Sequence, residues 1–262
     1  MFRMNQGLMK SMHLLGAAVL LLSGGTAAFA TPLNIAVAPN MKYAFADLQQ
    51  AFTKQTGIEV KGVFGPSGQL TAQIKSGAPF DVFLSADMSY PDSLYKDAVA
   101  VSAPKIYADG VLVLWTMKPL DLNKGIQVLK NAEVKKIAVV NPELEAYGRE
   151  AVNALDYFKL GASVKAKLVY GDSIPEVSQS IDSKSVDIGF TAKSAVLSPA
   201  FSGKGKWIEL PKGSYHPLDQ GAVILRYGSL INPAAARRFM DFLSSPAARE
   251  ILEKDGYQLP QS

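Results

Sequence analysis

Short apolar segments alternate with amphipathic ones along most of the chain, and this alternation restricts the fold more than any other feature. Leu33–Ala38 is apolar enough for a buried strand, and the stretch after it places Phe45, Leu48 and Phe52 at helical spacing. Similar strand-like segments bounded by turn residues follow at 58–64, 81–85, 107–115, 136–140, 167–170, 186–190 and 221–226. Strands that alternate with helices favour an α/β fold of mostly parallel sheets flanked by helices.

The end of the chain is strongly periodic. The apolar residues of Pro233–Lys254 fall on one stripe, which predicts a single long helix. No composition break, repeat or low-complexity segment divides the 262 residues, so periodicity alone predicts no domain boundary.

The first thirty residues have the three-part pattern of a cleaved secretory signal peptide. Basic residues without acidic ones precede the apolar run Leu14–Leu22, and Ala28-Phe29-Ala30 supplies the small residues of a cleavage site. An uncleaved anchor is the alternative, but a membrane-spanning helix needs about 20 apolar residues. The pattern therefore predicts residues 1–30 as signal peptide and an exported, periplasmic mature chain.

The mature chain lacks the residues of several catalytic and metal-binding classes. It has no cysteine, and His216 is its one histidine. Thiolate nucleophiles and sites built from several histidines or cysteines are therefore excluded, and a Ser-His-Asp triad is disfavoured. Removing Arg3 and Lys10 leaves 25 basic against 23 acidic residues, and this net charge of +2 is too small for a nucleic-acid surface. We expect no enzyme, no cofactor and no nucleic-acid partner.

Four predicted strand-to-helix turns, at 39–41, 66–69, 146–149 and 172–176, carry residues suited to the start of a helix. The last contains a capping box, with Ser173 as N-cap and Glu176 three residues later. The first turn of a helix presents unpaired backbone N–H groups and a partial positive charge of about 0.5, so it attracts anions. In open α/β sheets such turns lie where ligands bind. The turns therefore predict an anion site.

Neutral donors of this kind favour a fully ionised oxyanion. Molybdate, tungstate or sulfate only accepts hydrogen bonds, whereas hydrogen phosphate also needs an acceptor, usually a carboxylate. The carboxylate that stands out in these turns, Asp172, is assigned to capping or to the rim. We therefore expect a site without a titrating side chain and an affinity that changes little with pH near neutrality.

Three segments resemble the periplasmic molybdate-binding proteins of the type II periplasmic binding protein superfamily. They are SGAPFDVFLSAD at Ser76–Asp87, NPE and YGR within Asn141–Arg149, and the run Asp241–Tyr257. The resemblance implies a two-lobed fold with the ligand cleft between the lobes. Lobe 1 would comprise residues 31–110 and 220–262, and lobe 2 residues 111–219.

The same resemblance implies a function and partners. The chain would be the monomeric, extracytoplasmic substrate-binding protein of an ABC importer, with a permease as partner and molybdate or tungstate as ligand. Its alternatives are a protein of the same fold that binds sulfate, chromate or ferric iron, and a secreted hydrolase. Iron sites commonly use adjacent tyrosines, and no Tyr-Tyr pair occurs; a hydrolase would need a nucleophile with a base, and no G-x-S-x-G motif occurs.

Carried over from the family, the ligand contacts fall on four residues, which would hold the metal-containing oxyanion: Asn40, Ser67, Tyr147 and Ile174. Asn40 and Ser67 would donate from both side chain and backbone, and Ile174 from its backbone N–H alone. Each has a purely structural alternative: a turn for Asn40, a helix cap for Ser67, and packing for Tyr147 and Ile174.

Other residues near these motifs are assigned lesser roles. Many relatives have a tyrosine where this chain has Ala192, and Asn40 with Tyr147 fits a minority pattern in the family. Arg149 is interpreted as part of a solvated face or as a tie between the lobes, because an unpaired buried arginine is costly. Asp81 and Asp87 are interpreted as turn and cap residues rather than as a cation site.

Overall fold

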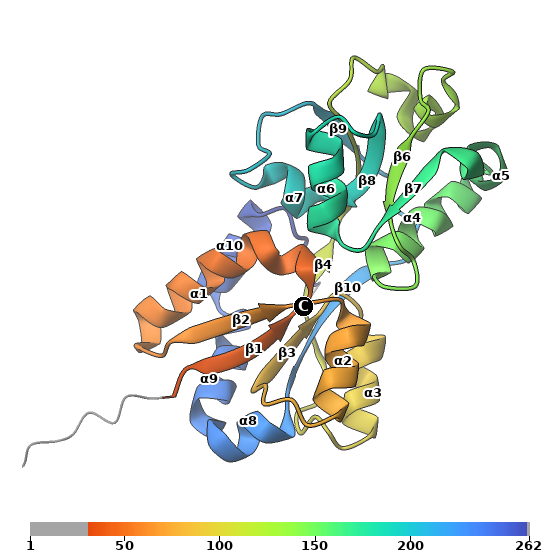
Figure 1. The fold of residues 1–262 in the computed structure, drawn as a ribbon. Helices are drawn as coiled ribbons and strands as arrows, with labels where there is room; N and C mark the ends of the chain where they lie inside the picture. The colour runs from red at the N-terminus through yellow and green to blue at the C-terminus, as the bar shows by residue number, and fades with distance from the viewer. Residues whose placement is uncertain (1–30, 261–262) are drawn as a thin grey trace, which may run out of the picture.

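Two five-stranded sheets, each covered by helices, form the two lobes of the molecule (Figure 1). The computed structural model describes residues 31–260, so the predicted signal peptide lies outside the described residues. Within 31–260, no helix is both long and apolar enough to cross a membrane.

The sheet of lobe 1 has the strand order β2-β1-β3-β10-β4. Strands β1 (Leu33–Val37), β2 (Val60–Phe64) and β3 (Val82–Ser85) are parallel. Strand β10 (Leu218–Ile224) runs antiparallel between β3 and β4 (Lys105–Gly110). The N-terminal part of the chain thus shares a sheet with a strand from its last quarter.

Helices cover both faces of this sheet. The lobe contains η1 (Pro39–Met41), α1 (Lys42–Thr56), α2 (Ser67–Lys75), α3 (Ser89–Lys96), α8 (Arg226–Ile231), α9 (Pro233–Leu243) and α10 (Pro246–Lys254). Helices α1, α9 and α10 contribute to the apolar cluster on one face, and α2 and α3 to the cluster on the other.

The sheet of lobe 2 has the order β7-β6-β8-β5-β9. Strand β6 (Ile137–Val140) is parallel to β7 (Leu168–Gly171) and β8 (Ile188–Ala192), whereas β5 (Leu112–Thr116) is antiparallel to β8 and to β9 (Lys206–Glu209). The helices of this lobe are η2 (Leu122–Lys130), α4 (Ala146–Tyr157), α5 (Gly161–Val164), η3 (Lys165–Lys167), α6 (Ile174–Asp182) and α7 (Lys193–Leu197).

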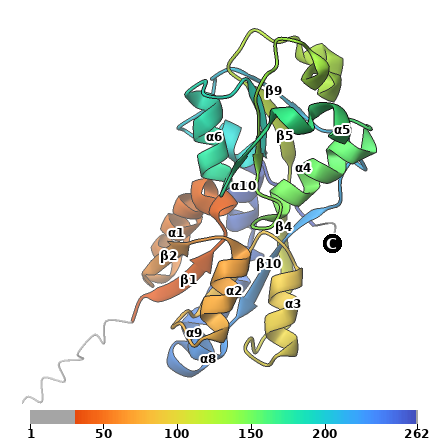
Figure 2. The same ribbon diagram turned by 45° about the vertical axis from the view of Figure 1, so that its right-hand side comes forward.

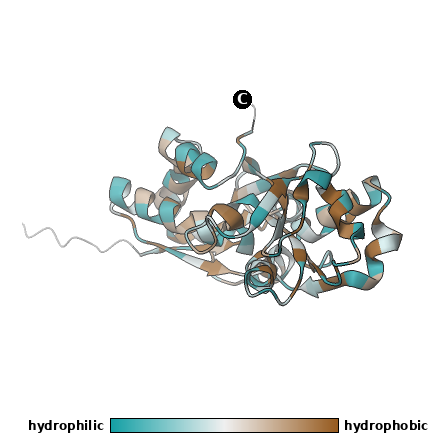
Figure 3. Ribbon diagram, turned by 90° about the horizontal axis from the view of Figure 1, so that it is seen from above, coloured by the Kyte–Doolittle hydropathy of each residue, from teal (hydrophilic) through white to brown (hydrophobic). Residues whose placement is uncertain are grey.

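The buried apolar residues form separate cores. The cluster of lobe 2 lies entirely between Val111 and Leu218, and the two clusters of lobe 1 lie on the two faces of its sheet. Viewed from above, hydrophobic and hydrophilic positions alternate along the helices (Figure 3). The predicted division at 31–110 with 220–262 and at 111–219 stays a prediction, and the membership of the cores is consistent with it.

The chain crosses between the lobes at two places (Figure 2). One crossing is the junction of β4 and β5, and the other is the segment between β9 and β10. The predicted strand 107–115 is therefore two strands, separated at Val111 and paired in different sheets. The crossing strands also make both sheets mixed, because parallel pairing is confined to β1–β3 and β6–β8.

The prediction of one helix over Pro233–Lys254 is wrong at its centre, where α9 ends and α10 begins. The Ser245 hydroxyl accepts a hydrogen bond from the Ala248 N–H at 3.3 Å and so caps α10. Pro246 has no N–H to continue the hydrogen bonds of α9, and its fixed φ suits the first turn of a new helix. The local capping residues override the continuous apolar stripe.

Asp81 ties three segments of lobe 1 together. One carboxylate oxygen accepts from the Asn34 backbone N–H at 2.7 Å, and the other accepts from Asn232 Nδ2 at 3.0 Å. The carboxylate is fully buried yet satisfied on both oxygens, which supports the structural role predicted for it over a cation site.

Replacing Ser245 by alanine should lower the free energy of unfolding by about 1 kcal/mol, because the first turn of α10 loses its cap. Urea unfolding of ligand-free protein measures this. Ser244→Ala is the matched control, because this neighbouring serine is exposed and should change stability by no more than about 0.5 kcal/mol. Equal losses in the two variants would contradict the capping role.

Candidate functional site

The structure places all four predicted site residues at helix starts that meet between the lobes. Asn40 lies in η1 after β1, and Ser67 is the first residue of α2. In lobe 2, Tyr147 is the second residue of α4 and Ile174 the first of α6. All four are at most 3% exposed. Helix α6 contacts η1, so the starts of helices from both lobes adjoin one another.

The backbone N–H groups at these positions are available as donors. The first N–H groups of a helix have no intrahelical partner. None of the four donates to a turn or loop carbonyl within the described residues. Because the helix macrodipole adds partial positive charge at the same ends, this buried region favours an anion without any lysine or arginine.

Ser67 does not cap its own helix, so the capping alternative is not supported. The N-cap of α2 is Pro66, and no side chain caps this end. The Ser67 hydroxyl oxygen instead accepts from the Ala86 N–H at 3.2 Å. No group in residues 31–260 is recorded as accepting the hydroxyl proton, which leaves the O–H of Ser67 available to a ligand.

The Asn40 side chain belongs to a buried hydrogen-bond network. Its Nδ2 donates to Gln220 Oε1 at 2.7 Å and to the Tyr257 hydroxyl at 3.2 Å. Tyr257 in turn donates to the Asn40 carbonyl at 3.0 Å. Gln220 is oriented by donating to the Leu218 carbonyl at 2.7 Å. Both amide hydrogens of Asn40 are thus engaged, and its free donor is the backbone N–H rather than the side chain that the sequence analysis also expected.

The Tyr147 hydroxyl points toward the crossing between the lobes. A side-chain carbon at Gly110 would lie 2.2 Å from this oxygen, so only glycine permits the approach. The hydroxyl is buried without a hydrogen-bond partner in the described residues. Burial raises the pKa of Tyr147 well above its ordinary value, although the nearby Asn40 side chain lowers it somewhat. Tyr147 therefore stays protonated and has an unused O–H to donate.

The start of α6 has the predicted N-cap, but Glu176 reaches back to the residue before the N-cap rather than to the N-cap itself. Ser173 is the N-cap, and its hydroxyl accepts from the Glu176 N–H at 3.4 Å. The Glu176 carboxylate accepts from the Asp172 N–H at 2.8 Å. The Ile174 side chain is fully buried in the lobe 2 core, so its backbone N–H is the part that can face a ligand.

Glu145 is a titrating residue that the sequence analysis did not place in the site. It is the N-cap of α4, two residues before Tyr147, and is 2% exposed. Burial raises the pKa of its carboxyl group to about 8, while the nearby Ile174 N–H lowers it in part. Neither carboxylate oxygen makes a hydrogen bond of ordinary geometry. The only sequence signal for Glu145 was its place beside the YGR motif.

Arg149 ties the two lobes together, as one of its two predicted interpretations proposed. Its guanidinium forms an ion pair with Asp87, which follows β3 in lobe 1. The other oxygen of Asp87 accepts from the Ser89 N–H at 2.7 Å, in the predicted turn role. The Arg149 side chain is 36% exposed, so this pair lies at the rim rather than inside the site.

Further contacts hold the lobes closed. The Ser194 hydroxyl of lobe 2 donates to the Asn40 carbonyl of lobe 1 at 3.4 Å. The rings of Tyr43 and Phe201 pack edge to face across the lobes, with centroids 6.1 Å apart. Ala192, where many relatives have a tyrosine, is fully buried at the end of β8 and offers only its backbone.

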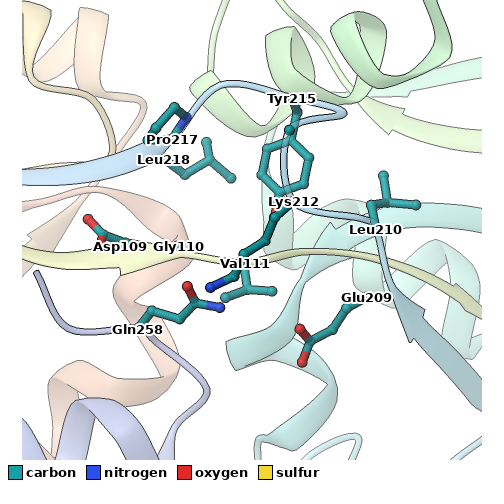
Figure 4. Close-up of a pocket in the computed structure, with 11 residues that line it drawn as sticks. Asp109, Gly110, Val111, Glu209, Leu210, Lys212, Tyr215, Pro217, Leu218 and Gln258 are labelled. Carbon is teal, nitrogen blue, oxygen red and sulfur yellow. The ribbon is translucent and has the colours of Figure 1, made fainter. Parts of the chain in front are cut away.

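Two cavities adjoin the closed site. One of about 180 Å³ lies between the lobes and is lined by Ala86, Asp87, Met88, Ala146, Glu150, Pro217, Leu218 and Asp219. A second, of about 320 Å³, lies at the two crossings, where Tyr215, Lys212 and Gln258 point into it (Figure 4). None of the four predicted residues lines either cavity, so we assign neither to the ligand and place the second in the hinge region.

The titratable groups of residues 31–260 form no separate metal centre. Within residues 31–260, no cluster of three or more histidine or acidic side chains could hold a metal ion. His216 lies beside the second crossing with its side chain 79% exposed, and its ring contacts Glu150 at 3.2 Å. His216 therefore lies at the surface.

The comparisons with known proteins match this architecture. The family model described as bacterial extracellular solute-binding protein matches residues 33–258. The molybdate-binding protein ModA of Azotobacter vinelandii is 38% identical over 89% of this chain and 92% of its own length. ModA of Rhodobacter capsulatus is 36% identical, over 92% of this chain and 95% of its own length.

A solved structure also matches the fold of this chain. The periplasmic molybdate-binding protein of Azotobacter vinelandii superposes with a TM-score of 0.81 at 34% identity, covering 87% of this chain and all of that one. The match extends over both lobes, which confirms the predicted two-lobed α/β fold. This chain belongs to the bacterial extracellular solute-binding protein family.

Proposed function

We propose that this protein is the periplasmic substrate-binding protein of an ABC importer and that it binds molybdate or tungstate. The observation that carries the proposal is the convergence of four helix starts, two from each lobe, on a buried region with unused donors. Relatives that are 36–38% identical over most of their length are named as molybdate-binding proteins, which supports the same ligand class here.

The donors suit a fully ionised dianion. The N–H groups of Asn40, Ser67 and Ile174 and the hydroxyls of Ser67 and Tyr147 can all donate to oxygen atoms that only accept. These neutral groups surround the charge with fixed dipoles, so the site avoids the desolvation cost of an unpaired buried cation. The same residues would hold molybdate or tungstate through its oxygens, and no cofactor is needed.

A binding role fits the site better than catalysis. Among residues 31–260, the one histidine has an exposed side chain, so no imidazole lies beside the buried hydroxyls of Ser67 and Tyr147 to activate a nucleophile. The rim pair Arg149–Asp87 and the contact Ser194–Asn40 would instead hold the lobes over a bound ligand. We propose that the monomer delivers the ligand to a permease when the lobes open at the two crossings.

Adding about 1 mM molybdate or tungstate should raise the melting temperature, because a ligand at about 1,000 times its dissociation constant stabilises the native state by about 4 kcal/mol. Sulfate should raise it much less, because it is smaller and its hydrogen bonds in the same site would be longer. A thermal-shift series with the three anions tests this. If sulfate raised the melting temperature as much as molybdate does, the alternative of a sulfate-binding protein of the same fold would be favoured instead.

Replacing Ser67 by alanine should weaken molybdate binding by roughly ten- to a hundredfold, because a hydrogen bond to a charged acceptor contributes about 1.5–3 kcal/mol. Calorimetric titration gives the affinity. Ser245→Ala is the matched control, since it removes a hydroxyl that serves only the fold and should leave the affinity unchanged. An unchanged affinity in Ser67→Ala would place the anion elsewhere.

The Arg149→Ala variant separates a neutral site from a charge-paired one. The Arg149–Asp87 pair is partly exposed, and such pairs contribute about 0.2–1 kcal/mol, so its loss should weaken binding by no more than about fivefold. A much larger loss in Arg149→Ala, together with a normal affinity in Ser67→Ala, would replace the neutral-donor site with one centred on the guanidinium.

A further inference from the structure

Glu145 is a buried acid that makes no hydrogen bond of ordinary geometry in the described residues, although the Ile174 N–H lies close to its carboxyl group. Its backbone begins α4, and its carbonyl accepts from the N–H groups of Gly148 and Arg149 at 3.1 and 3.3 Å. Its side chain makes no capping hydrogen bond to this helix. Both carboxyl oxygens are buried without a hydrogen bond in the described residues. Burying a carboxyl group without a hydrogen bond costs free energy of folding, unless a bound ligand supplies the missing partner.

The side chain lies at the candidate site rather than in the core. The Ile174 N–H, a proposed ligand donor at the start of α6, is close enough to affect the carboxyl group. Tyr147, with its own unpartnered hydroxyl, is two residues away on α4. Glu145 thus adjoins both donors that lobe 2 is proposed to contribute, at the positive end of a nine-residue helix.

No cation is available to keep Glu145 ionised. The titratable groups on α4 and on the segments near it include Arg149, Glu150, Asp156, Tyr157, Asp172, Glu176, Asp182, Asp87, Asp219, His216, Tyr43 and Tyr147. Arg149, the permanent cation among them, is held by Asp87 at the rim. No side-chain charge contributes to the shifted pKa of Glu145, whose largest cause is burial and which lies at about 8. The carboxyl group is therefore mainly neutral at pH 7.

We propose that Glu145 is an additional ligand of the oxyanion in its protonated form, and that binding is coupled to one proton. The neutral carboxyl group donates its O–H to an oxygen of the dianion, as the neighbouring N–H and hydroxyl groups do. When Glu145 starts ionised, its carboxylate takes up one proton from solvent on binding, because two buried negative charges side by side would repel each other. The inference rests on the proposed function and adds a pH-sensitive ligand to it.

The pH dependence follows from the direction of the shift. The protonated form that binds is fully present well below the pKa of about 8 and is lost as the pH rises through that value. Molybdate remains a dianion over the same range. Affinity should therefore be highest at and below neutral pH and should fall in alkaline solution, unlike the nearly flat profile expected from the sequence.

The test is calorimetric titration of the protein with sodium molybdate from about pH 6 to about pH 9. The wild-type dissociation constant should rise roughly tenfold between pH 7 and pH 9, given a pKa of about 8. Repeating the titration at pH 9 in buffers of different ionisation enthalpy should show uptake of close to one proton. This second measurement needs no variant.

The Glu145→Gln variant should bind molybdate with a flat pH profile and without proton uptake, because the amide N–H replaces the acid O–H and does not titrate. Its affinity at low pH should lie within about threefold of the wild type. Glu143→Gln is the matched control: this glutamate is exposed two residues earlier on the same loop, and its variant should keep the wild-type profile.

Several results would overturn the proposal. A wild-type affinity that is flat to pH 9, or that increases with pH, would remove the coupling while leaving the proposed function intact. Binding of hydrogen phosphate by the wild type and its loss in Glu145→Gln would make Glu145 an acceptor for a protonated oxyanion instead. Failure of both molybdate and tungstate to bind at every pH would overturn the proposed function together with the inference.

Discussion

Unpaired N–H groups at the starts of four helices have to be held in one buried place, and most of the architecture follows from this requirement. A buried dianion needs many donors at once, and one helix start supplies only a few. Two lobes are needed because α2 and η1 approach from one sheet and α4 and α6 from the other. Glycines at 110 and 148 permit this convergence, since a side chain at either would overlap neighbouring atoms at 2.2 Å.

The hydrogen-bond network around Asn40 holds the η1 turn of the candidate site in place. Gln220 comes from β10, Tyr257 from the segment after α10, and Ala86 from the end of β3, so residues far apart in the sequence fix one turn. Apart from Asn40 Oδ1, the polar side-chain atoms of this network are hydrogen-bonded, and such buried networks favour one arrangement, because a member left without a partner loses a hydrogen bond in a low-dielectric region. This network connects the η1 turn, whose backbone N–H is a proposed donor, to three segments distant in the sequence.

Charged side chains pair at the rim of the candidate site, whereas its interior is lined mainly by uncharged donors. The Arg149–Asp87 pair is partly solvated and joins the lobes at modest energetic cost, whereas the interior has hydroxyls, N–H groups and one acid. A buried carboxyl group beside a bound dianion is tolerable only while it is neutral, and burial raises the pKa of Glu145 to about 8, which favours that form near pH 7. The site can thus respond to pH without any histidine.

The sequence by itself determined the elements and the chemistry that depends on neighbours in the chain. The strand segments, the N-cap at Ser173 and the four helix starts could be predicted because apolar periodicity and capping are local. Only the tertiary structure decided which sheet each crossing strand joins and that Gln220 and Tyr257 engage the Asn40 amide. It also decided that Glu145 is buried. Strand pairing, burial and pKa depend on groups distant in sequence, so no local pattern around Glu145 distinguishes it from the exposed Glu143.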